Sequence, residues 1–330
     1  MAKGFLKQWS FNMVPFFPEL LPDEHIISAI ARYHRISGNR SADDTRSILG
    51  VPTGPLKPQD VFNRPFHGSL ETVSTLVQMP ATKTANLHSL AALYRITMSP
   101  SFRPKRNQLD QWAQGNTDIP PPHQVMNDRM LAFDKSWQLC PECLLSDQRQ
   151  FGIPYWHVAH QIPSVTSCNF HHTPLVATAL KTLSNLELPS DVRCNQRTAA
   201  ISNPDWDAWL TVFFSKLQTQ NVRPNLDTLK RLITSIWDIP SRPQKARNSR
   251  FQQVLEQIEQ TVGEQFLSSL FEYYQGGKPT HRGRRRPNFI RTSLVQDASK
   301  LRHPIYYLIP LWASGVTPAI FDLQWDDELP

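Results

Sequence analysis

The sequence has few glycines, few cysteines and no long apolar run. No uninterrupted apolar stretch approaches the roughly 20 residues that cross a bilayer. The apolar residues near the start are interrupted by lysines, unlike those of a secretory signal. Prolines outnumber glycines, 28 to 12, which favours many helix starts and stiff connectors over long strands. We therefore expect a cytoplasmic, mainly helical protein.

The familiar catalytic motifs are also missing from the sequence. It has no Gly-x-x-x-x-Gly-Lys-Ser/Thr, which excludes a P-loop ATPase, and no Gly-x-Ser-x-Gly. No spaced acidic triad in an α/β context suggests a two-metal nuclease or transposase. We therefore predict a protein that is not an enzyme.

Charge and length set the broad class. The 330 residues suggest two or three domains, and 40% hydrophobic with 19% charged residues is typical of a folded soluble protein. The formal net charge of +7 favours an anionic partner, nucleic acid first, and the excess lies late in the chain.

Three of the four cysteines fall into a metal-ligand pattern. Cys140 and Cys143 form Cys-x-x-Cys, and Cys168 and His171 form Cys-x-x-His after a gap of 24 residues. Two tight turns, each with two ligands, supply the closed tetrahedral set of one structural zinc ion. Pro141 helps to fix the first turn.

Other arrangements stay open at this point. His172 is an alternative fourth ligand, and His157 and His160 lie in the gap but are more often packing or hydrogen-bonding residues. Cys194 is left over, most simply as a free thiol. A redox Cys-x-x-Cys is disfavoured because the surroundings do not follow a βαβ pattern.

A composite motif carries a family resemblance. Cys-Pro-x-Cys is followed by Tyr155-Trp156, then by His160-Gln161-Ile162-Pro163, and then by Cys168-x-x-His171-x-x-Pro174-Leu175. This resembles the zinc-finger segment of the TniQ/TnsD family, target-selection proteins of Tn7-like transposons. The opening helix of the family is matched by Pro22-Asp23-Glu24, Ser28, Ala31 and Arg32, and one departure is Phe170, where the family usually has Lys.

A late motif favours the TnsD branch. Arg302-His303-Pro304 followed by an apolar run resembles the C-terminal region of TnsD-type proteins. Because those proteins are commonly longer, the resemblance implies a TnsD-like chain that is truncated.

The resemblance implies a target-site selector. Such a protein recognises double-stranded target DNA and recruits a TnsC-like AAA+ transposition regulator. One alternative is a TniQ-type adaptor that links an RNA-guided CRISPR effector complex to this regulator without reading sequence itself. A further alternative, a zinc-dependent hydrolase, would require an open metal position.

The fold expected is mainly α, with helix-turn-helix-like helical domains around a small structural zinc-finger module. We expect an N-terminal helical domain over 1–122, the zinc module over 123–185, and a basic C-terminal helical domain over 186–330. Tyr155 and Trp156 are expected in the core. Helices are predicted over 24–36, 42–49, 69–78, 84–93, 204–217, 226–236, 251–262 and 266–274.

The basic residues of the last third are candidate DNA contacts. From Lys278 to Arg302 there are eight Lys/Arg against one acid, Asp297. Guanidinium groups hold phosphates well because they are always charged and bidentate, although such a run is often only a solvated loop. We predict base reading by helices near 226–237 and 287–300. The predicted DNA contacts are Arg242, Lys245, Arg247, Arg282, Arg284, Arg285, Arg286 and Arg291.

Overall fold

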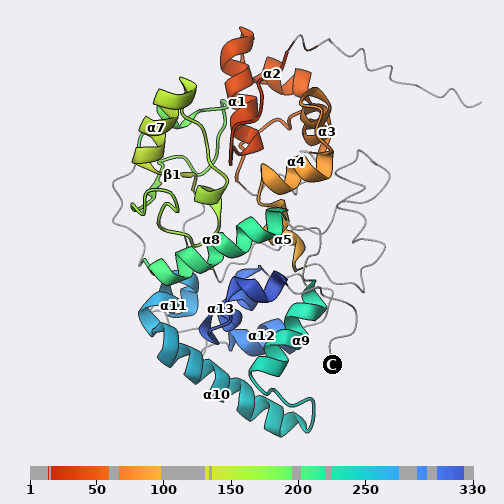
Figure 1. The fold of residues 1–330 in the computed structure, drawn as a ribbon, viewed down its shortest axis with the longest axis vertical. Helices are drawn as coiled ribbons and strands as arrows, with labels where there is room; N and C mark the ends of the chain where they lie inside the picture. The colour runs from red at the N-terminus through yellow and green to blue at the C-terminus, as the bar shows by residue number, and fades with distance from the viewer. Residues whose placement is uncertain are drawn as a thin grey trace, which may run out of the picture.

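The computed structural model describes residues 14, 16–58, 67–97, 131–133, 136–194, 202–219, 225–274, 288–295 and 303–322. Within these ranges the chain forms twelve α-helices and one pair of two-residue strands. The prediction of a mainly helical fold with a zinc-finger-like Cys3His cluster is thereby confirmed. Figure 1 places the N-terminal helices and the cysteine-rich segment in one half and the later helices in the other.

The first half opens with five short helices. Ser41 and Asp44 make the capping box of the second helix, which ends at Gly50 in the left-handed conformation, as the sequence predicts. The helices are α1 (Ile26–Ser37), α2 (Ala42–Leu49), α3 (His67–Leu76), α4 (Ala81–Leu87) and α5 (Ala91–Arg95).

Two predicted helix boundaries are wrong. The cap of α1 is His25, which accepts the N–H of Ile27, because Asp23 lies in a left-handed turn at φ 55° and accepts the N–H of Ala159 instead. The single helix predicted over 84–93 is broken between α4 and α5. There the His88 carbonyl accepts the N–H of Ile26, and its ring bonds the Glu24 carbonyl.

The cysteine-rich segment has little regular structure and is joined to α1. Its elements are β1 (Gln138–Leu139), α7 (Pro141–Phe151), the 3₁₀ turns η4 (Ala159–Gln161) and η5 (Pro189–Asp191), and β2 (Val176–Ala177), antiparallel to β1. The N–H of His25 donates to the Trp156 carbonyl, and the N–H of Trp156 donates to Ser28 Oγ. Tyr155 and Trp156 are buried, which confirms their predicted place in the core.

One long helix crosses the middle of the molecule between the two halves (Figure 1). This is α8 (Pro204–Thr219), which contacts α4 and α5 on one side and η7 (Pro318–Asp322) on the other. The other elements of the second half are α9 (Leu226–Ile236), α10 (Gln244–Val262), α11 (Glu264–Leu270), η6 (Glu272–Tyr274), α12 (Phe289–Val295) and α13 (Ile305–Ala313).

The helix predicted over 251–262 begins earlier, at Gln244. The prediction followed the apolar residues that face the core, and the first two turns of α10 are almost entirely exposed. The predicted domain boundaries stay a prediction.

Candidate metal centre

The first pair of ligands is built on the start of α7. Cys140 is the N-cap and its Sγ accepts the N–H of Cys143 at 3.5 Å, while Pro141 occupies the first helical position. This turn carries both sulfurs to the positive end of the helix dipole, where thiolates are favoured. Both cysteines are almost fully buried.

The second pair lies on a tight turn after η4. The N–H of Cys168 donates to the Thr173 carbonyl at 2.8 Å, and the N–H of His172 donates back to the Cys168 carbonyl at 2.8 Å. His172 is left-handed, at φ 55°, which closes the turn. Within the described residues the structure brings His171, not His172, to the three sulfurs.

The four ligand atoms of Cys140, Cys143, Cys168 and His171 lie within 4.8 Å of one another. Cys143 Sγ is 3.6 Å from Cys168 Sγ, and His171 Nδ1 is 3.2 Å from Cys143 Sγ and 3.6 Å from Cys140 Sγ. A tetrahedral ion with metal–sulfur bonds of 2.3 Å separates its sulfurs by about 3.8 Å. This donor set therefore fits one tetrahedral ion and could hold it with no further ligand.

The protonation of the sulfurs is coupled. The hydrogen bond between Cys143 and Cys168 raises the pKa of Cys143, assisted by burial, and lowers the pKa of Cys168. A bound cation would displace the thiol protons, because cysteines bind metals as thiolates. His160 Nε2 lies 3.7 Å from Cys143 Sγ, as a neighbour of the site and not as one of its four ligands.

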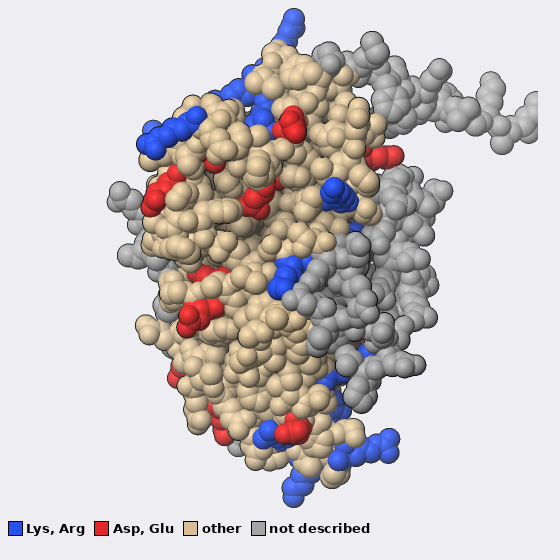
Figure 2. Space-filling model, viewed as in Figure 1, with Lys and Arg blue, Asp and Glu red and all other residues tan. Residues whose placement is uncertain are grey.

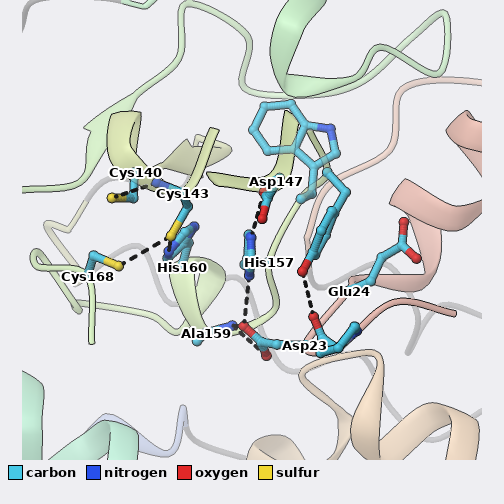
Figure 3. A network of polar contacts seen from close by, with 12 residues as sticks. Asp23, Glu24, Cys140, Cys143, Asp147, His157, Ala159, His160 and Cys168 are labelled. Carbon is cyan, nitrogen blue, oxygen red and sulfur yellow. Dashed lines mark hydrogen bonds and ion pairs between the residues drawn. The ribbon is translucent and has the colours of Figure 1, made fainter. Parts of the chain in front are cut away.

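A buried histidine ties α7 to the segment before α1 (Figure 3). His157 Nε2 donates to Asp147 Oδ2 at 2.9 Å, and Nδ1 lies 3.4 Å from Asp23 Oδ2. Burial by itself would lower the pKa of His157, but the two carboxylates outweigh it and raise the pKa to about 9. The ring also stacks on Tyr155, with centroids 4.3 Å apart.

The turn that carries Cys168 is anchored to α8. Asp207 is buried and its Oδ2 accepts the Thr166 N–H, the Thr166 hydroxyl and the Ser167 hydroxyl, at 2.8–3.1 Å. Trp206 Nε1 donates to Ser164 Oγ at 3.0 Å. The metal centre is therefore held from both directions, by α1 and by α8. The sequence analysis missed Asp207, although an acid in the first turn of a helix is a recognisable anchor.

The other predicted site residues fall into two groups. Arg242, Lys245 and Arg247 lie together where α10 begins, and Arg291 is exposed on α12. Arg282, Arg284, Arg285 and Arg286 lie outside the described residues. Cys194 is a free, exposed thiol away from the cluster.

Two residues of the opening motif, Glu24 before α1 and Arg32 within it, form a buried ion pair. Arg32 donates from Nε to Glu24 Oε1 and from Nη2 to Glu24 Oε2, each at 2.7 Å, and both side chains are buried. Nη2 donates as well to the Glu19 carbonyl, at 2.6 Å. These contacts fix the chain that leads into α1 next to the cysteine-rich segment.

The helices α1 and α8 anchor a segment that carries a Cys3His cluster, so this is a helical protein with a zinc-finger-like module. A scan against protein-family models matches residues 15–175, about half of the chain, to the TniQ family. The chain carries a TniQ domain and is thus a TniQ/TnsD-family protein, which indicates involvement in Tn7-like transposition. A search of curated proteins finds no match.

The match covers α1 to α7 and all four candidate ligands, and it ends before α8. The helices from α8 onwards, including the basic start of α10, lie outside it. None of the helices in the described ranges is long and apolar enough to span a bilayer.

Proposed function

We propose that this protein selects the target site of a Tn7-like transposition system by binding double-stranded DNA and recruiting an AAA+ transposition regulator. The observation that carries the proposal is the pairing of a TniQ domain with a separate basic surface on the later helices. We assign DNA binding to that surface and contact with the regulator to the TniQ domain.

The basic surface consists of Arg242, Lys245 and Arg247. It lies at the junction between α9 and α10. Figure 2 shows Lys and Arg side chains gathered at the lower end of the molecule, where Figure 1 places this junction. Arg242 and Lys245 are exposed, and neither has a carboxylate partner among the described residues. No acid occurs between Asp238 and Glu256. Such an unpaired cluster suits a phosphate backbone, whose released counterions drive binding.

The described residues on either side of the predicted arginine run in the sequence contact α10, the helix whose start carries this surface. Asn288, which follows the run, donates from Nδ2 to the Phe251 carbonyl on α10 at 2.8 Å. Tyr274, which precedes it, donates to Glu259 of the same helix at 2.6 Å. Chain connectivity thus supports a role for Arg282, Arg284, Arg285 and Arg286 as further phosphate contacts.

We also propose that the Cys3His cluster holds one structural zinc ion. The donor set of three thiols and one imidazole suits zinc, and the ion would stabilise a module whose described residues form two short strands, one α-helix and one 3₁₀ turn. Its four protein ligands leave no open position for water or substrate. This argues against the zinc-dependent hydrolase alternative.

The test measures duplex binding of the full chain against salt concentration. A variant with Arg242→Ala and Lys245→Ala is compared with Arg40→Ala and Lys181→Ala, which remove the same charge from exposed positions in the TniQ half and just beyond it. We expect the slope of log K against log salt to flatten by about two in the first variant only. The purified AAA+ regulator should then bind the protein–DNA complex and not the DNA alone.

The adaptor alternative gives a different result in the same assay. An adaptor would bind duplex weakly, without sequence preference, and lose binding with salt in both variants alike. It would require an RNA-guided CRISPR effector complex to reach the target. Absence of duplex binding by the wild-type chain at low salt would contradict the proposed DNA-binding function.

A further inference from the structure

The first three turns of α10 present an unusual outer face. Lys245, Asn248, Ser249 and Gln252 lie at helical spacing on one stripe, and all four are exposed. A neighbouring stripe of α10 is buried against the second half of the molecule. It consists of Phe251, Val254, Leu255 and Ile258.

The side chains of the outer face are of the types that read base edges. Amide groups of Asn and Gln pair with the N6 and N7 edge of adenine, and Lys pairs with O6 and N7 of guanine. The polar contacts of Asn248 and Gln252 run along α10 itself, from Gln244 and to Glu256, at 2.9 Å each. These exposed contacts do not attach the face to any other element.

The charges along α10 oppose the helix dipole. The basic residues Lys245, Arg247 and Arg250 lie in the first two turns, and Glu256 and Glu259 lie in the second half of the helix. Acids near the start and bases near the end would have stabilised the helix, so this order costs stability. Positions where the charges of a helix depart from this dipole preference are often functional surfaces. The order does match a polyanion lying over the start of the helix.

The start of α10 is rigidly supported and lacks a side-chain cap. Pro243 is its N-cap and makes no capping hydrogen bond, so no N-cap side chain satisfies the N–H groups of the first turn. Arg250 Nε donates to the Trp237 carbonyl at 2.9 Å, which fixes α10 against the end of α9. Arg247 lies over the Phe251 ring at 5.5 Å. Arg250 is therefore a supporting residue, and the outer face projects from a fixed base.

We propose that α10 is the recognition helix of this protein and that its first three turns enter the major groove of the target duplex. Asn248 and Gln252 contact base edges there, while Arg242 and Lys245 contact the flanking phosphates. Three turns extend about 16 Å, which covers about five base pairs. This inference rests on the proposed DNA-binding function and assigns base reading to one face.

The two helices that the sequence analysis favoured for base reading are poorer candidates. On α9 only Arg231 and Ser235 are exposed, and the remaining side chains are buried or half-buried. In the described part of the region 287–300, α12 covers seven residues, and Phe289 and Ile290 are buried. Among the described residues, the exposed polar face of α10 is thus the better candidate for base reading.

The experiment selects bound duplexes from a random library with three forms of the full chain. The wild type is compared with Asn248→Ala/Gln252→Ala and with a control pair on the same helix, Gln257→Ala/Gln260→Ala, both exposed. Alanine is a good helix former, so both variants should fold alike, and far-ultraviolet circular dichroism checks this.

We expect the wild type and the control to select the same motif of about five base pairs. The Asn248/Gln252 variant should lose preference at two or more positions, by about 5- to 150-fold each, with its salt slope unchanged. An unchanged motif in that variant, or unselective binding by the wild type, would overturn the assignment of α10. Absence of any duplex binding would instead overturn the proposed function, and the assignment with it.

Discussion

The ion pair of Arg32 and Glu24 gives a sharp prediction about stability. Arg32→Met removes three charge-assisted hydrogen bonds, two to Glu24 and one to the Glu19 carbonyl. The Glu24 side chain is fully buried and, among the described residues, keeps only the N–H of Leu21, at 3.0 Å. The variant therefore leaves a carboxylate buried without a countercharge.

The expected cost is about 3–5 kcal/mol, the range for a buried pair that loses one partner. This is a large part of the roughly 5–15 kcal/mol that stabilises a typical protein. Replacing both residues with Met removes the stranded charge as well. We therefore expect Glu24→Met/Arg32→Met to be more stable than Arg32→Met alone.

Thermal unfolding of the metal-loaded protein measures these differences, with a fall in Tm of about 5–10 °C expected for Arg32→Met. The matched control is Arg35→Met, which breaks the exposed pair between Arg35 and Asp191 near the end of the same helix. Exposed pairs contribute about 0–1 kcal/mol, so the control should unfold close to the wild type. Equal losses in Arg32→Met and Arg35→Met would refute the reasoning from burial.

Three further predictions concern the zinc module and its contacts. Cys143→Ser should reduce bound zinc from one equivalent to none by elemental analysis, whereas Cys194→Ser should retain it, and retention in both would contradict the ligand set. The folded protein raises the pKa of His157 to about 9, so protonated His157 contributes stability. This contribution is fully present below pH 6.5 and is lost as the pH rises through 9. Metal-saturated wild type should therefore lose about 3 kcal/mol relative to His157→Gln between pH 6.5 and 9.5, and parallel curves would contradict this. Arg46→Met removes the guanidinium donor of the Pro52, Gly54 and Ser184 carbonyls and should cost about 3 kcal/mol in denaturant unfolding, against about 0.5 kcal/mol or less for exposed Arg40→Met.

The elements that the sequence predicts well are those with local signals. Ser41, Asp44 and Gly50 specify α2 from within ten neighbouring positions, because capping groups act on their own helix. The spacing of Cys140, Cys143, Cys168 and His171 likewise brings four ligands together without knowledge of the rest of the fold.

The missed features depend on distant contacts or on a pattern that was not sought. His88 interrupts the helix predicted over 84–93 because it bonds the segment around Glu24 and Ile26, far away in the chain. The helix α7 is absent from the predicted helices, although Pro141 at its first position and Gly152 after its end are ordinary helix signals.

The base-reading face was overlooked for a related reason. The start of α10 has no apolar residue that faces the core before Phe251, so a search for apolar periodicity begins the helix there. Its exposed polar residues then appear to belong to a loop. Only the continuous helix from Gln244 shows that Asn248 and Gln252 share one face.

The most direct test of the account is selection of target duplexes by the purified, metal-loaded chain from a random library at two salt concentrations. The account predicts that one short motif is enriched and survives the higher salt, because base contacts add to the phosphate contacts. Binding that is unselective and disappears at the higher salt would contradict a direct reader of DNA, and would favour an adaptor whose target is chosen by an RNA-guided effector.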